Sequence, residues 1–184
     1  MIELQVQKYV KDACAKSENV FGTAFFEQHL QIVAEYGSKL ADKIGGDKEI
    51  IQLAAYLHDI SAVENINTLP NHAILSGELA QNILTDYGYP QAKIDIVKRS
   101  IFKHITPIQL QYGLIEEVCL SNADAISQII NPAYWLYFVY NIRKMSFDEG
   151  RNWLIDRVES NWDKLIIPAK ELIEEQYLLV KKLL

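Results

Sequence analysis

The sequence predicts an all-α fold, and three observations support that prediction. Apolar residues recur at intervals of three and four along nearly every segment, which is the period of an amphipathic helix. No stretch of useful length alternates apolar and polar residues, as a half-buried strand would. The residues between these segments are also typical helix start and stop signals. Gly45 and Gly46 end one segment, Asp47 begins the next, and Pro168 divides or kinks the last one.

The expected helices follow one another along the whole chain. Between the third and fourth of them, residues 61–71 are expected to form a loop, broken by Pro70 and lying just after His58 and Asp59. Ser146 is expected to cap the last helix, with Asp148 and Glu149 in its first turn. The predicted helices cover residues 2–17, 22–46, 47–59, about 72–87, about 91–104, about 112–130, 134–145 (short and strongly aromatic) and 146 to the end.

Composition limits the class of protein. The 184 residues suit a single domain, 1–184, and the formal net charge of -6 argues against a nucleic-acid polymer as partner. No segment is apolar over the length of a membrane span, and the N-terminal segment lacks an apolar signal core. Cys14 and Cys119 lie far apart in helical contexts, which predicts buried free thiols in a reducing compartment. We therefore expect a cytoplasmic protein without a membrane partner.

The four histidines of the chain lie on different predicted helices or at their ends. Each has an ordinary explanation by itself: His29 and His104 fall on apolar faces, where a hydrogen-bonded core imidazole is common, and His72 could be a surface residue. Asp124 stands in an apolar helical run and could pair with an arginine. Considered together, buried imidazoles and carboxylates would be costly unless they satisfied one another.

A divalent metal ion would satisfy such a set, because it takes neutral imidazole nitrogens and anionic oxygens directly. Ligands of these two kinds suit Mn, Fe, Co, Ni or Zn better than Mg or Ca. His58 and Asp59 are neighbours in "YLHDIS", so on a helix they point about 100° apart. An ion beside the end of the helix could still reach both, and Asp59 has a second oxygen with which to bridge two ions.

The order His29, His58-Asp59, Asp124 resembles the signature of the HD superfamily of metal-dependent phosphohydrolases. The segments "YLHDIS" and "SNADAIS" resemble its central helix and its final Asp motif, over residues 20–130. The resemblance implies an HD-domain-like helical bundle with the metal site between core helices. The C-terminal helices, about 133–184, would pack on this core.

Two further segments extend the resemblance. "PNHAILSGELAQNIL" and "FKHITP" are similar to motifs of the bacterial HD hydrolases that cleave diadenosine tetraphosphate, a six-ligand subgroup. The resemblance implies one or two divalent ions and assigns a role to each ligand. Asp59 would bridge, and the first ion would be held by His29, His58, Asp59 and Asp124, the second by Asp59, His72 and His104.

The chain also departs from this family. Many members have Gly-Lys after "HDI", where the lysine helps to bind substrate phosphate, but here Ser61 and Ala62 stand there. We expect Lys103 or Arg99 to bind the phosphate instead. The C-terminal third does not resemble the hydrolase group, and its aromatic run "AYWLYFVY" predicts core or dimer interface rather than a stacking surface.

The activity that the resemblance implies is hydrolysis of a small phosphorylated compound, a nucleotide or dinucleoside polyphosphate, by a metal-activated water. Asp59 and His58 would be the catalytic residues, Asp59 by positioning the water and His58 as a terminal ligand. Two alternatives remain open, an HD-type di-iron oxygenase and a metal-binding domain without turnover. The sequence also leaves open whether the chain forms a homodimer.

Overall fold

The computed structural model describes residues 1–108 and 110–184, and every regular element in them is helical, so the all-α prediction is confirmed. Short helical turns of other types separate several α-helices. The elements are α1 (Ile2–Cys14), a π-helical turn (Phe26–Leu30), α2 (Gln31–Ile44), α3 (Lys48–Leu57), α4 (Ile60–Glu64), a 3-10 turn (Ile66–Asn71), α5 (His72–Asp86), α6 (Gln91–Lys103), α7 (Ile115–Ile130), α8 (Pro132–Tyr137), a second π-helical turn (Phe138–Ile142), α9 (Phe147–Lys164) and α10 (Ile167–Leu183).

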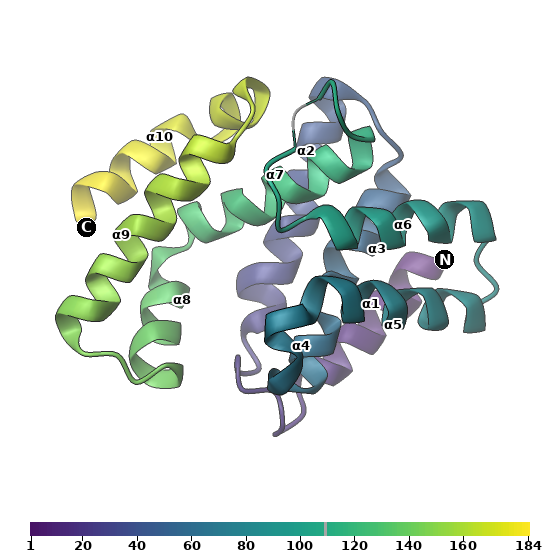
Figure 1. Cartoon of the computed structure of the whole chain (residues 1–184), viewed down its shortest axis with the longest axis horizontal. Helices are drawn as coiled ribbons and strands as arrows, with labels where there is room; N and C mark the ends of the chain where they lie inside the picture. Colours follow the sequence, from purple (N-terminus) through teal and green to yellow (C-terminus); the bar gives the residue numbers. More distant parts are fainter. Residues whose placement is uncertain (109) are drawn as a thin grey trace.

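Helix α7 is the central element of the bundle. Its side chains from Glu117 to Ser127 are buried without interruption, as expected of a helix covered on all sides. It packs against α2, α3 and α6 on one side and against α9 and α10 on the other. Figure 1 accordingly shows α7 between α1–α6 and the C-terminal helices α8–α10.

Several predicted helix ends agree with the structure. The Asp47 carboxylate accepts hydrogen bonds from the backbone N–H groups of Glu49 and Ile50, so it caps α3. Ser146 and Glu149 form a reciprocal capping box at the start of α9. Pro168 lies in the first turn of α10 and separates that helix from α9.

The predicted loop over residues 61–71 is wrong. Residues 60–64 form α4 and residues 66–71 form a 3-10 turn, so this segment is helical rather than an irregular loop. Ala62 and Val63 are almost fully buried, and burial of these apolar side chains favours the extra helical turn. Ser61 Oγ lies 2.9 Å from Ser76 Oγ, a hydrogen bond that fixes α4 against α5.

Other boundaries also differ from the prediction, and the helix expected over residues 22–46 begins only at the π-helical turn Phe26–Leu30. The first helix ends at Cys14 rather than at residue 17, and α7 begins at Ile115 rather than at residue 112. The aromatic helix predicted over 134–145 begins earlier, at Pro132, and changes to a π-helical turn at Phe138. Helix ends fray and depend on tertiary contacts, so they are the least predictable part of a helix.

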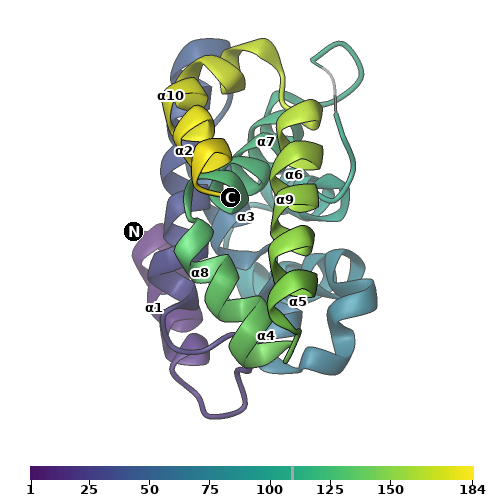
Figure 2. The same cartoon turned by 90° about the vertical axis from the view of Figure 1, so that its left-hand side faces the viewer.

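The C-terminal helices pack on the core through polar and aromatic contacts. Figure 2 shows α8, α9 and α10 together on the face of the molecule that looks toward the viewer. The Asn122 side-chain oxygen on α7 accepts a hydrogen bond of 2.9 Å from the backbone N–H of Ile166, between α9 and α10. The rings of Trp162 on α9 and Tyr177 on α10 stack 3.9 Å apart.

The aromatic run at residues 133–140 contributes to the core, because Tyr134, Trp135 and Phe138 are buried. The two cysteines are buried and free, as predicted. Among the described residues, none of the helices has the length and apolarity that a membrane crossing requires.

Candidate metal centre

The structure brings all six predicted ligands to one place, and most of them lie at helix ends. His58 follows α3, Asp59 precedes α4, and His72 is the first residue of α5. His104 follows α6, whereas Asp124 lies in the middle of α7. The sixth, His29, lies in the first π-helical turn, a wide turn of a kind that is often found at functional sites.

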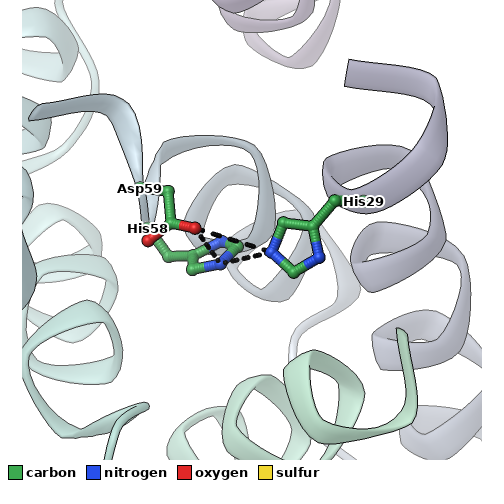
Figure 3. A group of neighbouring side chains, drawn as sticks. All are labelled: His29, His58 and Asp59. Atoms are coloured by element: carbon green, nitrogen blue, oxygen red, sulfur yellow. Dashed lines mark hydrogen bonds and ion pairs between the residues drawn. The ribbon is translucent and has the colours of Figure 1, made fainter. Parts of the chain in front are cut away.

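His29, His58 and Asp59 form the first cluster (Figure 3). The Nε2 atoms of His29 and His58 lie 3.2 Å apart, and Asp59 Oδ2 lies 3.5 Å and 3.3 Å from them, respectively. Asp124 closes the cluster from α7, since its Oδ1 lies 3.6 Å from His29 Nε2. Both imidazoles are almost completely buried.

Asp59, His72 and His104 form the second cluster. The Nε2 atoms of His72 and His104 lie 3.2 Å apart, and Asp59 Oδ1 lies 3.5 Å from His72 Nε2. The two carboxylate oxygens of Asp59 therefore face different clusters, Oδ2 the first and Oδ1 the second. Asp59 is the one residue that belongs to both groups.

The hydrogen bonds at Nδ1 fix the tautomer of the histidines at the helix ends. In His58, His72 and His104, Nδ1 lies 2.6–2.8 Å from the carbonyl oxygen three residues earlier. A carbonyl oxygen can only accept, so each Nδ1 carries the proton. At His58 this bond also satisfies a carbonyl in the last turn of α3, where the helix supplies no partner of its own.

His29 obtains the same tautomer from a neighbouring hydroxyl. Ser127 on α7 donates its hydroxyl proton to the Asp124 carbonyl oxygen at 2.8 Å. The Ser127 oxygen therefore accepts from His29 Nδ1, also at 2.8 Å. All four imidazoles thus carry their Nδ1 proton on an outward hydrogen bond and turn Nε2 inward. Hydrogen bonds of this kind hold metal-ligating histidines in the orientation that ligation needs. Ser127 stands in the quoted "SNADAIS", but its role needed the packing of α7 against the first π-helical turn.

Burial and charge shift the pKa values of these groups in opposite directions. Burial lowers the pKa of His58, but the adjacent Asp59 carboxylate outweighs it and raises that pKa to about 9. Burial, with the charge of His58, lowers the pKa of His104 to about 4. Burial would raise the pKa of the Asp59 and Asp124 carboxyl groups. Neighbouring positive groups outweigh it, keeping the pKa of Asp59 well below its usual value and lowering the pKa of Asp124 to about 2. Both carboxylates are therefore charged at neutral pH.

These residues fit divalent ions by their chemistry and their spacing. Two neutral Nε2 atoms only 3.2 Å apart direct their lone pairs at each other, which is repulsive unless a proton or a metal cation lies between them. Two nitrogens bound to one ion at about 2.0–2.1 Å are also separated by roughly 3 Å. Each cluster adds carboxylate oxygen to imidazole nitrogen, so each could hold a divalent ion.

A cavity of about 300 Å³ opens onto the two clusters. Asp59, His72, His104 and Asp124 line it on the side of the core. The opposite side comes from the C-terminal helices and from the segment before the first π-helical turn. Its apolar wall consists of Phe21, Phe25, Trp135, Phe138 and Trp153, and its basic groups are Arg143, Arg157 and Lys164.

Lys103 and Arg99, the predicted phosphate-binding residues, do not line this cavity. The Arg99 guanidinium pairs with the buried carboxylate of Glu117, and the Lys103 side chain is exposed and lies over the ring of Phe102. Both residues line a separate surface hollow. They point away because α6 turns its polar face outward, whereas His104, the residue that follows this helix, is buried.

The cavity residues on α9 were missed by the sequence reasoning, although one signal was available. Trp153, Arg157 and Lys164 are spaced by four and seven, so they share one face of a helix. Nothing in the sequence indicates that this face looks toward the metal ligands. That orientation follows from the packing of α9 on α7.

Comparison with known proteins agrees with this geometry. The HD domain family model matches residues 26–129, which is more than half of the chain. A protein of Clostridium beijerinckii without an assigned function is 37% identical over 65 residues, covering 35% of this chain and 41% of that protein. The chain thus matches less than half the length of that relative.

Among solved structures, the crystal structure of a predicted HD superfamily hydrolase from an uncultured Thermotogales bacterium is similar to this chain. The two align with a TM-score of 0.59 and 24% sequence identity, over 85% of this chain and 84% of the other. This likeness shows a shared fold.

Proposed function

The chain belongs to the HD domain family, and from this premise and the geometry of the site we propose that it is a metal-dependent phosphohydrolase. The similar Thermotogales structure, described as a predicted hydrolase, supports the same reaction class. The observation that carries the proposal is the pair of histidine clusters joined by Asp59, whose two carboxylate oxygens face different clusters. Divalent ions held there would polarise a phosphoryl group and lower the pKa of a water molecule.

We propose a role for each of the six residues. His29, His58, Asp59 and Asp124 hold one ion, and Asp59, His72 and His104 hold a second. Asp59 would be shared by the two ions, because its backbone is fixed between α3 and α4 and its two oxygens face different clusters. The Nδ1 hydrogen bonds keep each imidazole in the orientation that ligation requires, so little reorganisation accompanies the loading of metal.

The finer proposal for the substrate is a small nucleotide. The aromatic wall on the far side of the cavity supports it, because a planar base can pack against aromatic rings while its phosphate lies at the metal ligands. Trp153 is half-buried, and its ring is covered on one side by Arg157, 5.0 Å from the guanidinium carbon to the ring centroid. The cavity volume of about 300 Å³ lies at the small end of the range for ligand sites.

The test is to load the metal-free protein separately with Mn, Fe, Co, Ni and Zn and to measure phosphate release. Nucleotides, dinucleoside polyphosphates and simple phosphate esters are the substrates to compare. We expect hydrolysis with at least one ion, and its loss in His58→Ala. Metal bound without phosphate release from any substrate would refute the proposal. Oxygen consumption by the iron-loaded protein would then favour the di-iron oxygenase alternative.

A further inference from the structure

Three basic side chains of the cavity are held by the C-terminal helices and the turn before them. Arg143 follows the second π-helical turn, and Arg157 and Lys164 lie on one face of α9. All three line the same cavity as the candidate metal ligands. They are therefore positioned to meet the same ligand as the two clusters.

Within residues 1–108 and 110–184, no carboxylate oxygen lies within 4.0 Å of a side-chain nitrogen of any of these three residues. Eight of the other basic residues, by contrast, do lie within 4.0 Å of a carboxylate oxygen. Lys93 lies 2.9 Å from Asp47, for example, and Lys43 lies 3.0 Å from Glu171. The concentration of unpaired positive charge in one cavity indicates an anionic ligand.

Lys164 connects this basic group to the metal clusters. Burial lowers its pKa, Asp124 acts in the opposite direction, and Arg157 adds to the lowering. The ammonium group of Lys164 therefore lies within electrostatic range of both Asp124, a candidate metal ligand, and Arg157. Lys164 is partly buried beside Asp124, whereas Arg157 is exposed, farther from the clusters. Arg157 is in addition held over the face of Trp153, which limits the directions its guanidinium can take.

The amount of charge decides between two kinds of substrate. Two divalent ions and the two carboxylates leave a net charge of about +2, which already matches one phosphate group at about −1.5 to −2. Arg143, Arg157 and Lys164 add positive charge beyond the needs of a single phosphate. Among the described residues of the core, no lysine or arginine lines this cavity.

We propose that Arg143, Arg157 and Lys164 form a second anion subsite, which binds a phosphate group other than the one that is hydrolysed. The substrate class is then a compound with two or more linked phosphates, such as a nucleoside di- or triphosphate, rather than a simple monoester. This inference rests on the proposed function for the scissile phosphate, but the subsite itself can be tested by binding alone.

The experiment compares orthophosphate with imidodiphosphate, in which a nitrogen bridge resists hydrolysis, by calorimetry on the metal-loaded full chain. In Arg143→Gln/Arg157→Gln we expect the affinity for imidodiphosphate to fall at least about tenfold, while that for orthophosphate changes less than about twofold. Both arginines are exposed, so the variant should keep its fold and metal content, which thermal unfolding and metal analysis would check. Lys144→Gln is the matched control, because it removes one charge next to Arg143 from outside the cavity lining.

The outcomes separate this proposal from the proposed function. An unchanged affinity for imidodiphosphate in the double variant overturns the subsite, whether or not the protein hydrolyses phosphates. A loss in Lys103→Gln instead would also overturn it and place the subsite in the surface hollow. Selective loss in the double variant, together with absence of turnover on every substrate, would support the subsite and reject the phosphohydrolase.

Discussion

The motif-bearing core and the C-terminal helices contribute different things to the same cavity. The core, α1–α7 with its turns, supplies all six candidate metal ligands, and four of them lie at helix ends. The C-terminal helices supply none of these ligands, but they provide much of the aromatic wall and, with the turn before α9, the basic groups. If the proposed function holds, the core would carry the metal-dependent chemistry and the C-terminal helices would select the molecule that is bound.

The largest effect should come from the residue that the two clusters share. In Asp59→Asn the amide has one oxygen and no charge, so it cannot serve both clusters. We expect hydrolysis to fall by at least about 10³-fold and the metal content to drop from about two ions to fewer than one. Metal analysis with phosphate-release rates measures both. Glu64→Gln, an exposed carboxylate bonded to Tyr9, is the matched control. Full metal content in Asp59→Asn would contradict the bridging role.

A smaller effect should follow from removing one ligand of the second cluster alone. His104→Asn keeps a polar group of reduced reach at the end of α6, but it removes the Nε2 ligand. We expect one ion to remain and the rate to fall about 10²-fold, because the first cluster keeps its four ligands. Metal analysis decides the outcome. Loss of both ions would show that the two clusters are not separable, and loss of neither would exclude His104 as a ligand.

The binding of metal should release protons rather than take them up, because His58 must lose its proton to act as a ligand. The pKa of His58 is about 9 in the metal-free chain, so this imidazole is protonated at pH 7.5, whereas ligation requires the neutral form. We expect about one proton to be released at the first cluster, with affinity rising about tenfold per pH unit toward pH 9. Calorimetry in Tris and HEPES, which differ in ionisation heat, measures the release. Identical heats in the two buffers would contradict the prediction.

The same shift affects the stability of the metal-free chain. Because the folded pKa of His58 lies above the usual 6.5, its pairing with Asp59 stabilises the fold fully below pH 6.5. This contribution is lost as the pH rises through about 9. Thermal unfolding of metal-free protein should therefore show a midpoint that falls over this range, and Asp59→Asn should remove most of the fall.

The smallest effect should come from the C-terminal helices. Trp153→Leu removes part of the aromatic wall without touching any candidate ligand, so we expect KM to rise about fivefold while the metal content stays unchanged. Steady-state kinetics on the best nucleotide substrate measures the change. Phe147→Leu, a largely exposed aromatic at the start of α9, is the control. Loss of metal in Trp153→Leu would contradict the prediction that the C-terminal helices affect substrate binding without affecting metal binding.

Much of the core could be predicted from the sequence because its signals are local. Helical periodicity gave most of the helices, and the caps at Asp47 and Ser146 depend only on neighbouring residues. The ligand set could be proposed because burying several imidazoles and carboxylates in apolar segments costs free energy unless a partner such as a metal ion compensates them. The prediction of a loop over residues 61–71 was wrong because Pro70 fits within a 3-10 turn and because Ser61 finds its hydrogen-bond partner, Ser76, on a different helix.

By itself, therefore, the sequence determined an all-α chain of the HD type and the identity of the residues that could bind metal. Only the tertiary structure decided that Asp59 directs one oxygen to each cluster, that Ser127 fixes the tautomer of His29, and that Arg157 and Lys164 reach the cavity while Arg99 and Lys103 do not. The physical reason is that periodicity shows which residues share a helix face, but the face that turns inward is set by packing between elements far apart in the chain.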